Sequence, residues 1–503
     1  MLLAMALAKE CKPMRTAIKL MLDGTVAKPR FQALATTAAM AVVLLTWSAA
    51  WAQPAIGPPA PAGVQILYVL EDIRVEGSPK TSLALIEDMI GLEVGQQIGP
   101  LEMKAVRLQM LSSGYFEKVS LSLDKGSAKN HVVLVIEVVE RNTIILSDAF
   151  LGVSKQHPFW GGLDVVEGNL FGRGLTLGAA FVVGKEQWAV RGALSDPDLM
   201  GLPLSTGGSG YWINGREAIF VASQRLLPEG VREPRRLEFE RIGGELGVGF
   251  YPLALLGVFV DVGFESIDGR SDVPELTQDT YLLQGRSYHG MLRVALDHDT
   301  RDNPFLPTQG YRLNLSAQFS SSAVASDYDY ARLVLSTSYV KPLGWNDSGH
   351  VLRIDLFGGI VLGNPPFYER FYIGDVTALV PSRDLGLNFA GNASIDFLNR
   401  GADNLGYEKV VAGGGVEYGV PLMRSPGEIF YRIEFFIGAG LFGMTTPGDL
   451  PATRNVNLAV DLVRTEETTV FPIDLTFDLG FRAETPIGIF GLSFANGLAL
   501  VPF

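Results

Sequence analysis

The chain of 503 residues has little of what several protein classes require. It contains one cysteine, Cys11, so disulfide bonds and cysteine-ligated metal sites are excluded from most of its length. Charged residues make up 19% of the sequence, against about 25% in ordinary soluble domains. Beyond residue 52 no stretch approaches the roughly 20 apolar residues of a membrane-spanning helix, which argues against a helical-bundle membrane protein.

Several kinds of partner and reaction are also excluded. The formal net charge of −13 provides no basic surface for phosphate backbones, so no nucleic acid is expected as a partner. The five histidines lack ligand spacing, so we predict no metal site and no cofactor. His298 lies between two aspartates, but the G-x-S-x-G turn of a serine hydrolase is absent. Gly438 to Gly443 fits a dinucleotide motif without the helix it needs, and we predict that the protein is not an enzyme.

The first 52 residues have the pattern of a secretory signal peptide. Lysines and arginines up to Arg30 precede an apolar stretch, and Ala50-Trp51-Ala52 has the small residues of a cleavage site. The basic region is long, which leaves open a translation start at Met14 or Met21, or a retained anchor helix. We predict a signal peptide over residues 1–52 and a proline-rich linker over residues 53–65.

Residues 66–142 predict one small α+β domain. Their apolar periodicity gives a strand, two helices and two more strands, at 73–77, 81–90, 101–111, 119–123 and 132–138. This order predicts a small sheet with helices on one face.

Residues 143–503 consist of long segments in which apolar and polar residues alternate, as in Ile473 to Glu484 and Tyr311 to Ser320. In lipid, backbone groups must pair within the protein, so such strands cross a membrane only as a closed barrel with apolar side chains outward. Segments of about 12 to 16 residues favour this barrel over a soluble all-β protein, whose strands are shorter. Fifteen segments begin near 145, 161, 173, 186, 203, 239, 254, 284, 309, 328, 350, 408, 428, 471 and 487. Bacterial single-chain barrels have even strand numbers, so we predict an all-β transmembrane barrel of about 16 antiparallel strands.

Several motifs resemble those of the BamA/TamA superfamily, the bacterial surface antigen barrels that carry N-terminal POTRA domains. Residues 66–142 are similar to a POTRA domain in Ile73 to Gly77, in Gly114-Tyr115-Phe116 and in the final Glu140-Arg141. Asn169 to Gly174 resembles the family's N-L-x-G-x-G hairpin. The family signature D-x-R-D-x-x-x-x-P-x-x-G is matched by Asp299, Arg301, Asp302, Pro307 and Gly310.

This resemblance implies a factor that inserts or translocates polypeptides at the cell outer membrane without an energy source, with the POTRA domain in the periplasm. The implied partners are unfolded outer-membrane or secreted polypeptides, periplasmic chaperones or accessory lipoproteins, and outer-membrane lipid. Clients would pair with the backbone of an open POTRA edge strand, formed here by Lys118, Val119, Ser120, Leu121, Ser122 and Leu123. In the alternative interpretation, the three apolar side chains of this strand only face the core.

The sequence departs from the family in an inward-folded loop. Where the family has V-R-G-[FY], this chain has Leu379-Val380-Pro381-Ser382, so the arginine that points into the lumen is replaced. We predict that Arg383 anchors the loop instead, with Glu417 as its candidate carboxylate. The alternative is that Arg383 pairs with Asp384 or contacts water.

The C-terminal region is the second departure, since the family usually has a further hairpin there. Phe494 and the terminal Phe503 resemble the signal by which outer-membrane barrels are themselves inserted, and an ordinary buried terminus is the alternative. Two other functions stay open. A dedicated two-partner-type secretion pore would need a plug, for which residues 53–65 are too short, and a passive outer-membrane channel would leave the POTRA domain unexplained.

Overall fold

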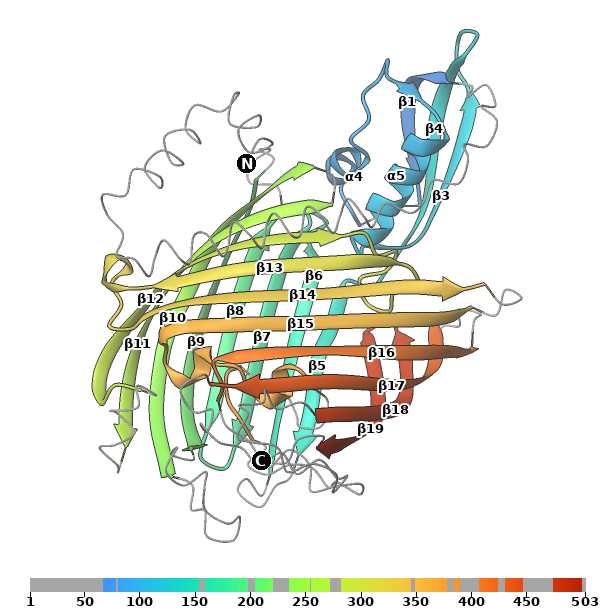
Figure 1. Cartoon of the computed structure of the whole chain (residues 1–503). Coiled ribbons are helices and arrows are strands. Elements are labelled where there is room, and N and C mark those ends of the chain that lie inside the picture. Colours follow the sequence, from blue (N-terminus) through green and yellow to red (C-terminus); the bar gives the residue numbers. More distant parts are fainter. Residues whose placement is uncertain are drawn as a thin grey trace, which may run out of the picture. The chain divides into compact units, whose positions relative to one another are not determined.

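The computed structural model describes residues 67–77, 80–152, 159–197, 204–219, 235–253, 255–271, 282–344, 349–377, 383, 385–389, 407–423, 430–446 and 474–499. These residues belong to one compact unit that begins at Leu67. They form a four-stranded sheet and a 15-stranded sheet (Figure 1). The predicted signal peptide and linker lie outside the described residues.

The small N-terminal domain contains four strands and two helices. In chain order these are β1 (Tyr68–Glu76), α4 (Leu83–Ile90), β2 (Gln97–Ile98), α5 (Pro100–Ser112), β3 (Phe116–Lys125) and β4 (His131–Glu140). The strand order in the sheet is β2-β1-β4-β3, with β1 parallel to β4 and β3 antiparallel to it. The predicted strands and helices are present, and the two-residue strand β2 is an addition that was too short to show periodicity.

Local sequence signals place both helices. Ser82 caps α4 by accepting a hydrogen bond from Leu85 N, and Gly91 ends the helix in the left-handed conformation with φ of 61°. Pro100 opens α5, where its fixed φ suits the first helical position. Apolar side chains of both helices pack on the sheet in one core, whose buried members include Leu70, Ile86, Met110, Leu134 and Ile136.

The larger sheet follows chain order without a crossover. Its strands are β5 (Ile144–Gly152), β6 (Trp160–Leu170), β7 (Leu175–Gly184), β8 (Trp188–Asp196), β9 (Leu204–Ile219), β10 (Arg235–Leu253), β11 (Leu256–Ser271), β12 (Gly285–Asp299), β13 (Gly310–Ser320), β14 (Asp329–Leu343), β15 (His350–Asn364), β16 (Val410–Met423), β17 (Arg432–Thr445), β18 (Asp474–Thr485) and β19 (Gly488–Ala499). Every neighbouring pair in this order is antiparallel, and the sheet curves round into a barrel (Figure 1). The predicted antiparallel barrel is confirmed, with fifteen strands among the described residues.

The two faces of the barrel wall differ as the alternation predicts. On β18 the apolar side chains of Phe477, Leu479 and Phe481 are exposed by 40–49%, which fits a face that contacts lipid. The opposite face carries charged residues such as Arg241 and Glu434, which are 8% and 0% exposed. No helix among the described residues is long and apolar enough to cross a membrane.

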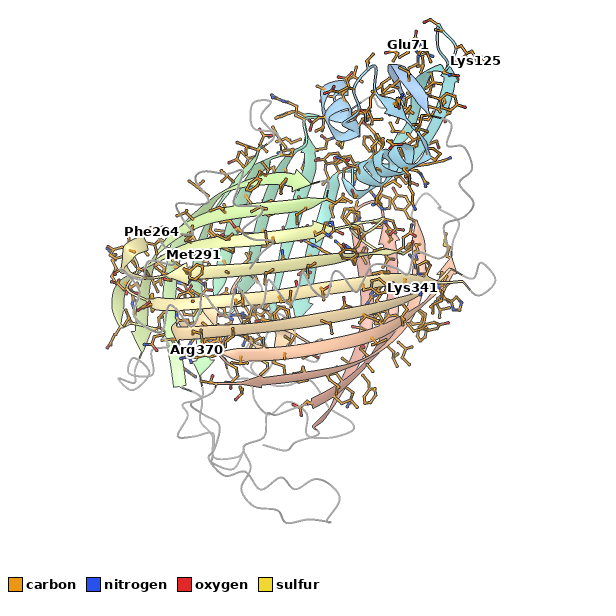
Figure 2. All side chains as sticks on the ribbon, turned by 45° about the horizontal axis from the view of Figure 1, so that its top comes forward. Glu71, Lys125, Phe264, Met291, Lys341 and Arg370 are labelled. Carbon is orange, nitrogen blue, oxygen red and sulfur yellow. The ribbon has the colours of Figure 1, made fainter. Side chains whose placement is uncertain are left out.

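A loop segment after β15 forms a second hydrophobic core. It includes the short helices η4 (Phe367–Glu369) and η5 (Ile373–Asp375), followed by residues up to Phe389. Its aromatic side chains cluster with buried residues of β6 to β11 and of β14 to β17. Because these strands lie all around the barrel wall, the segment must lie inside the lumen, as the resemblance implied. Arg370 of this segment is 5% exposed and is labelled in Figure 2.

Candidate functional site

The seam of the barrel lies between β5 and β19, the two ends of the sheet. Within the described residues, β5 has a ladder only with β6, and β19 only with β18. One backbone hydrogen bond joins the two sides at one end, from Leu146 N to Ile487 O over 2.7 Å. Successive strands alternate in direction, so the first and the fifteenth point the same way. The seam therefore presents two edges of equal direction that meet at one corner.

The predicted C-terminal signal lies partly on this seam. Phe494 on β19 is 67% exposed, and Leu492 beside it is 62% exposed, so this strand keeps an apolar outer face to the barrel edge. Phe503 lies outside the described residues. The role of both residues as an insertion signal stays a prediction.

The family signature forms the turn between β12 and β13. The Asp302 carboxylate accepts a hydrogen bond from Thr308 N over 2.8 Å, which closes the turn. Arg301 bends back onto Asp299, with Nη2 2.6 Å from Oδ2. Gly310 has φ of 107°, and a Cβ there would lie 2.4 Å from a backbone carbonyl oxygen across the turn. The aspartate and glycine positions of the motif thus shape the connection between these two strands.

Glu417 belongs to a cluster of charges on the lumen face of β15 to β18. Its Oε1 lies 2.8 Å from Arg353 Nη1, and it also pairs with Arg482. Arg353 contacts Glu434 at 2.5 Å and donates from Nη2 to the Pro307 carbonyl over 3.4 Å. Both oxygens of Glu417 therefore already have cationic partners on the barrel wall.

Arg383 pairs within the inward loop, and the structure does not bring it to Glu417. Its Nη1 donates to the Tyr368 carbonyl over 2.8 Å, and its Nη2 lies 2.7 Å from Asp375 Oδ2. The loop folds back on itself, so the Asp375 carboxylate, eight residues earlier in the chain, lies against Arg383. The expected pair with Glu417 is therefore corrected to a pair with Asp375. Arg383 as the loop's anchor stays a prediction, and Val380 and Asp384 lie outside the described residues.

A buried polar network attaches the inward loop to the barrel wall, and the sequence did not predict it. Glu265 on β11 lies 2.8 Å from Arg241 Nε, 2.7 Å from His289 Nδ1 and 2.7 Å from Tyr368 Oη. The Arg241 guanidinium stacks on the Tyr368 ring at 3.5 Å, and His289 Nε2 lies 2.8 Å from Tyr330 Oη. Strand alternation places the charged residues on the lumen face, but their partner Tyr368 comes from the loop, which has no such periodicity. In the described part of the chain, no group of three or more metal-ligating side chains occurs.

The predicted POTRA edge residues, 118–123, lie on β3 at one edge of the small sheet. Within the described residues this strand has a ladder only with β4, so its other side offers backbone groups to a further strand, although the Val119 carbonyl already accepts a hydrogen bond from Arg107 Nε over 3.1 Å. Val119 is 1% exposed and Leu121 packs against the core, whereas Leu123 is 38% exposed. The alternative that these side chains face the core therefore holds for the first two. A contact with clients would be made by the backbone.

Solved structures to which this chain is similar include BamA and two CdiB proteins. BamA from Haemophilus ducreyi lacking POTRA domains 1–3 has 14% identity and a TM-score of 0.50, covering 86% of this chain and 81% of that chain. CdiB from Escherichia coli has 10% identity and a TM-score of 0.49, with 95% and 96% covered. CdiB from Acinetobacter baumannii has 11% identity and a TM-score of 0.48, with 86% and 74% covered. These likenesses concern the fold, and comparison with curated protein sequences finds no match.

Two family models match the chain and confirm the predicted resemblance. A POTRA model, described as a surface antigen variable number repeat, matches residues 68–141. The Omp85 superfamily domain matches residues 169–499, which is more than half of the chain. Together with the barrel, the small domain before it and the signature turn, this match shows that the chain belongs to the Omp85 superfamily.

Proposed function

We propose that this protein inserts or translocates other polypeptides at the bacterial outer membrane, with its POTRA domain in the periplasm. The observation that carries the proposal is the seam, where the described residues of β5 and β19 form no ladder and one backbone hydrogen bond, from Leu146 N to Ile487 O, joins the two sides. Backbone groups left unpaired in lipid cost several kcal/mol each, so an open seam favours pairing with another strand.

The direction of the two edges favours one added strand. Because β5 and β19 run the same way, a single strand between them can be antiparallel to both. Its C-terminal end would lie beside Ile144, where β5 begins. Strand pairing is itself favourable, which agrees with a mechanism that uses no nucleotide hydrolysis.

The POTRA domain supplies a second edge for polypeptides. The backbone of β3 along residues 118–123 is suited to receive an extended segment of an unfolded outer-membrane or secreted protein. Periplasmic chaperones or accessory lipoproteins are the other partners that we propose for this domain, and outer-membrane lipid is the partner of the barrel's apolar face.

The loop segment that packs inside the lumen favours this role over that of a passive channel. Phe367, Phe371 and Tyr372 of the inward loop are fully buried among barrel side chains. A hollow of about 660 Å³ is found on the lumen side of β13 to β19, and Asp375 and Val376 of the same loop line it. This packed segment narrows the lumen for solutes, whereas the seam lies in the wall outside it.

Depletion of the protein separates assembly from transport of solutes. We expect the folded, heat-modifiable forms of other outer-membrane barrels to decrease when the protein is depleted, before growth stops. Normal amounts of every folded barrel, together with reduced uptake of small solutes, would refute the proposal. Loss of one secreted polypeptide with all barrels unchanged would identify a dedicated secretion pore.

Photo-crosslinking tests the POTRA edge separately. A benzoylphenylalanine at Ser122, which is exposed on β3, should crosslink to unfolded clients. Glu137 is the matched control position because it is also exposed but lies on the central strand β4. Equal crosslinking from the two positions would contradict recognition by the edge strand.

A further inference from the structure

The connection between β4 and β5 contains a buried arginine that contacts the last hairpin of the barrel. Arg141 pairs through Nη2 with Glu484 Oε1, and each side chain is 7% exposed. Glu484 lies near the end of β18, at the turn into β19. A residue shortly before the first barrel strand is therefore bound to the end of β18, next to the turn that precedes the last strand.

Two further contacts join the same two segments. Asn142 Nδ2 donates to the Pro486 carbonyl over 2.9 Å, and Leu146 N donates to the Ile487 carbonyl over 2.7 Å. Together with the ion pair of Arg141, they attach residues 484–487 to the start of β5. We call this set of three contacts the corner clamp.

The signature turn between β12 and β13 completes the surroundings of Arg141. Asn303 Nδ2 donates to Glu484 Oε1 over 2.9 Å, and the Arg141 guanidinium lies over the Phe305 ring, 4.8 Å from its centroid. On the other side, the Tyr431 ring centroid lies 5.4 Å from the guanidinium carbon, and Tyr431 N donates to the Glu484 carbonyl. The planar guanidinium thus has a carboxylate at its edge and aromatic rings near it, an arrangement that a lysine ammonium does not reproduce.

We propose that Arg141 is a positioning residue that makes this corner the hinge of the seam. A buried charge pair is costly to break, because either partner alone would be left as an unpaired buried charge. The described residues of β5 and β19 form no ladder beyond the corner, up to Gly152 and Ala499. The seam therefore separates from its far end while the corner stays closed. The inference rests on the proposed function in that a hinged seam matters to clients only if they use the seam.

Distances between spin labels test the hinge in the full-length protein reconstituted in lipid, with Cys11 replaced by serine. The corner pair of labels is placed by Ile144→Cys and Ile487→Cys, and the far pair by Leu151→Cys and Phe494→Cys, at four exposed positions. Double electron–electron resonance should give a narrow distance distribution for the corner pair and a broad one for the far pair. With Arg141→Ala, we expect the corner distribution to shift to longer distances and to broaden toward that of the far pair.

Matched variants separate the clamp from a general loss of structure. Arg191→Ala removes another barrel arginine, whose partner Asp164 lies on β6, and should leave the corner distribution unchanged. Arg141→Lys keeps the charge without the planar group, and it should broaden the distance distribution of the corner pair less than Arg141→Ala does. If Arg141→Ala yields no heat-modifiable barrel, Glu484→Gln removes the opposite charge at nearly the same size and should give the same broadening.

The outcomes distinguish the hinge from the proposed function. A corner distribution unchanged in Arg141→Ala, or in Glu484→Gln where that variant replaces it, overturns the hinge, whatever happens to clients. A second outcome is that the corner distribution broadens in Arg141→Ala while depletion of the protein from cells leaves all folded barrels at normal amounts. That pair of results supports the hinge and refutes the proposed function. A narrow far pair in the unaltered protein also overturns the hinge, because the seam would then be closed along its whole length.

Discussion

Removal of the Glu265 carboxylate should weaken the attachment of the inward loop to the barrel wall. In the folded protein this carboxylate lies within 2.8 Å of Arg241 Nε, His289 Nδ1 and Tyr368 Oη, and within 3.0 Å of Tyr211 Oη. Glu265→Ala leaves all four groups without this acceptor. Only Tyr368 belongs to the loop, so the substitution breaks a connection between the loop and strands β9 to β12.

The size of the expected stability loss follows from the burial of the Arg241–Glu265 ion pair. The Arg241 side chain is 9% exposed and the Glu265 side chain 2%, so the substitution leaves a buried guanidinium without its carboxylate. Breaking such a buried pair costs about 3–5 kcal/mol of folding free energy. Each hydrogen-bonding group left unsatisfied adds about 1–3 kcal/mol, but contributions within one network do not add simply. We therefore expect a loss of at least about 3 kcal/mol.

Urea unfolding of the reconstituted barrel, followed by tryptophan fluorescence, measures this loss. Asp268→Ala on the same strand is the matched control, because its pair with Arg270 has side chains exposed by 33% and 72%. Such surface pairs contribute about 0–1 kcal/mol, so the control should unfold almost as the unaltered protein does. A Glu265→Ala barrel that loses no more stability than Asp268→Ala would refute the reasoning. Limited proteolysis should also cut the loop faster in Glu265→Ala alone.

Three further predictions concern single positions. Gly359→Ala places a Cβ 2.2 Å from the Phe371 ring, so we expect a loss of about 1–3 kcal/mol in the same urea assay. Gly310→Ala forces φ of 107° on an alanine in the signature turn, and we expect a loss of about 1–3 kcal/mol, again measured by urea unfolding. Hydrogen bonds from Ser127 lower the pKa of Glu71 below its usual value of 4.5, at the end of the POTRA domain shown in Figure 2. The stabilisation from ionised Glu71 is present above the unfolded-state pKa and is lost as the pH falls through the lower folded-state pKa. An NMR titration of the Glu71 carboxyl carbon should show this pKa returning toward its usual value when residues 126–128 are deleted.

The strand positions could be predicted from the sequence because lipid imposes a strict pattern on a barrel wall. Each described barrel strand begins within four residues of its expected start, and the largest differences occur at Arg235 and Arg432. Both of these strands follow residues that the structure does not describe, where the sequence has no alternation to mark a boundary. Alternation therefore gives the wall and its two faces, whereas the ends depend on turns.

The side-chain pairs of the lumen could be predicted only in part. Glu265 and His289 lie directly opposite each other on β11 and β12, but this register depends on the long connection between the strands. Arg383 was expected to find a carboxylate on the wall, and it instead pairs with Asp375 in its own loop. The loop's fold is set by buried aromatic side chains such as Phe371, which have no periodic signature. Contacts formed by non-periodic segments are thus the part that sequence reasoning misses.

The signature motif shows how a pattern can be recognised before its physical reason is known. No partner could be predicted for the residues between its aspartate and proline positions, and the structure places Asn303 and Phe305 against the corner clamp. Asp302 and Gly310 shape the turn, whereas Asn303 reaches Glu484 of the last hairpin and Phe305 contacts Arg141. The spacing of the motif is therefore set both by turn geometry and by contact with the seam.

The number of strands bears directly on how the seam can close. Direct closure of fifteen strands would require β5 and β19 to form a parallel ladder, since both run in the same direction. They instead meet at a corner, and their outer faces stay apolar to the edge, with Leu151 on one side and Phe494 on the other exposed by 92% and 67%. A strand that completes the wall must therefore run antiparallel to both and carry apolar side chains at every second position, facing lipid. Selection of this kind depends on alternation and direction rather than on a particular sequence, which would let one seam accept many barrel-forming clients and reject soluble proteins.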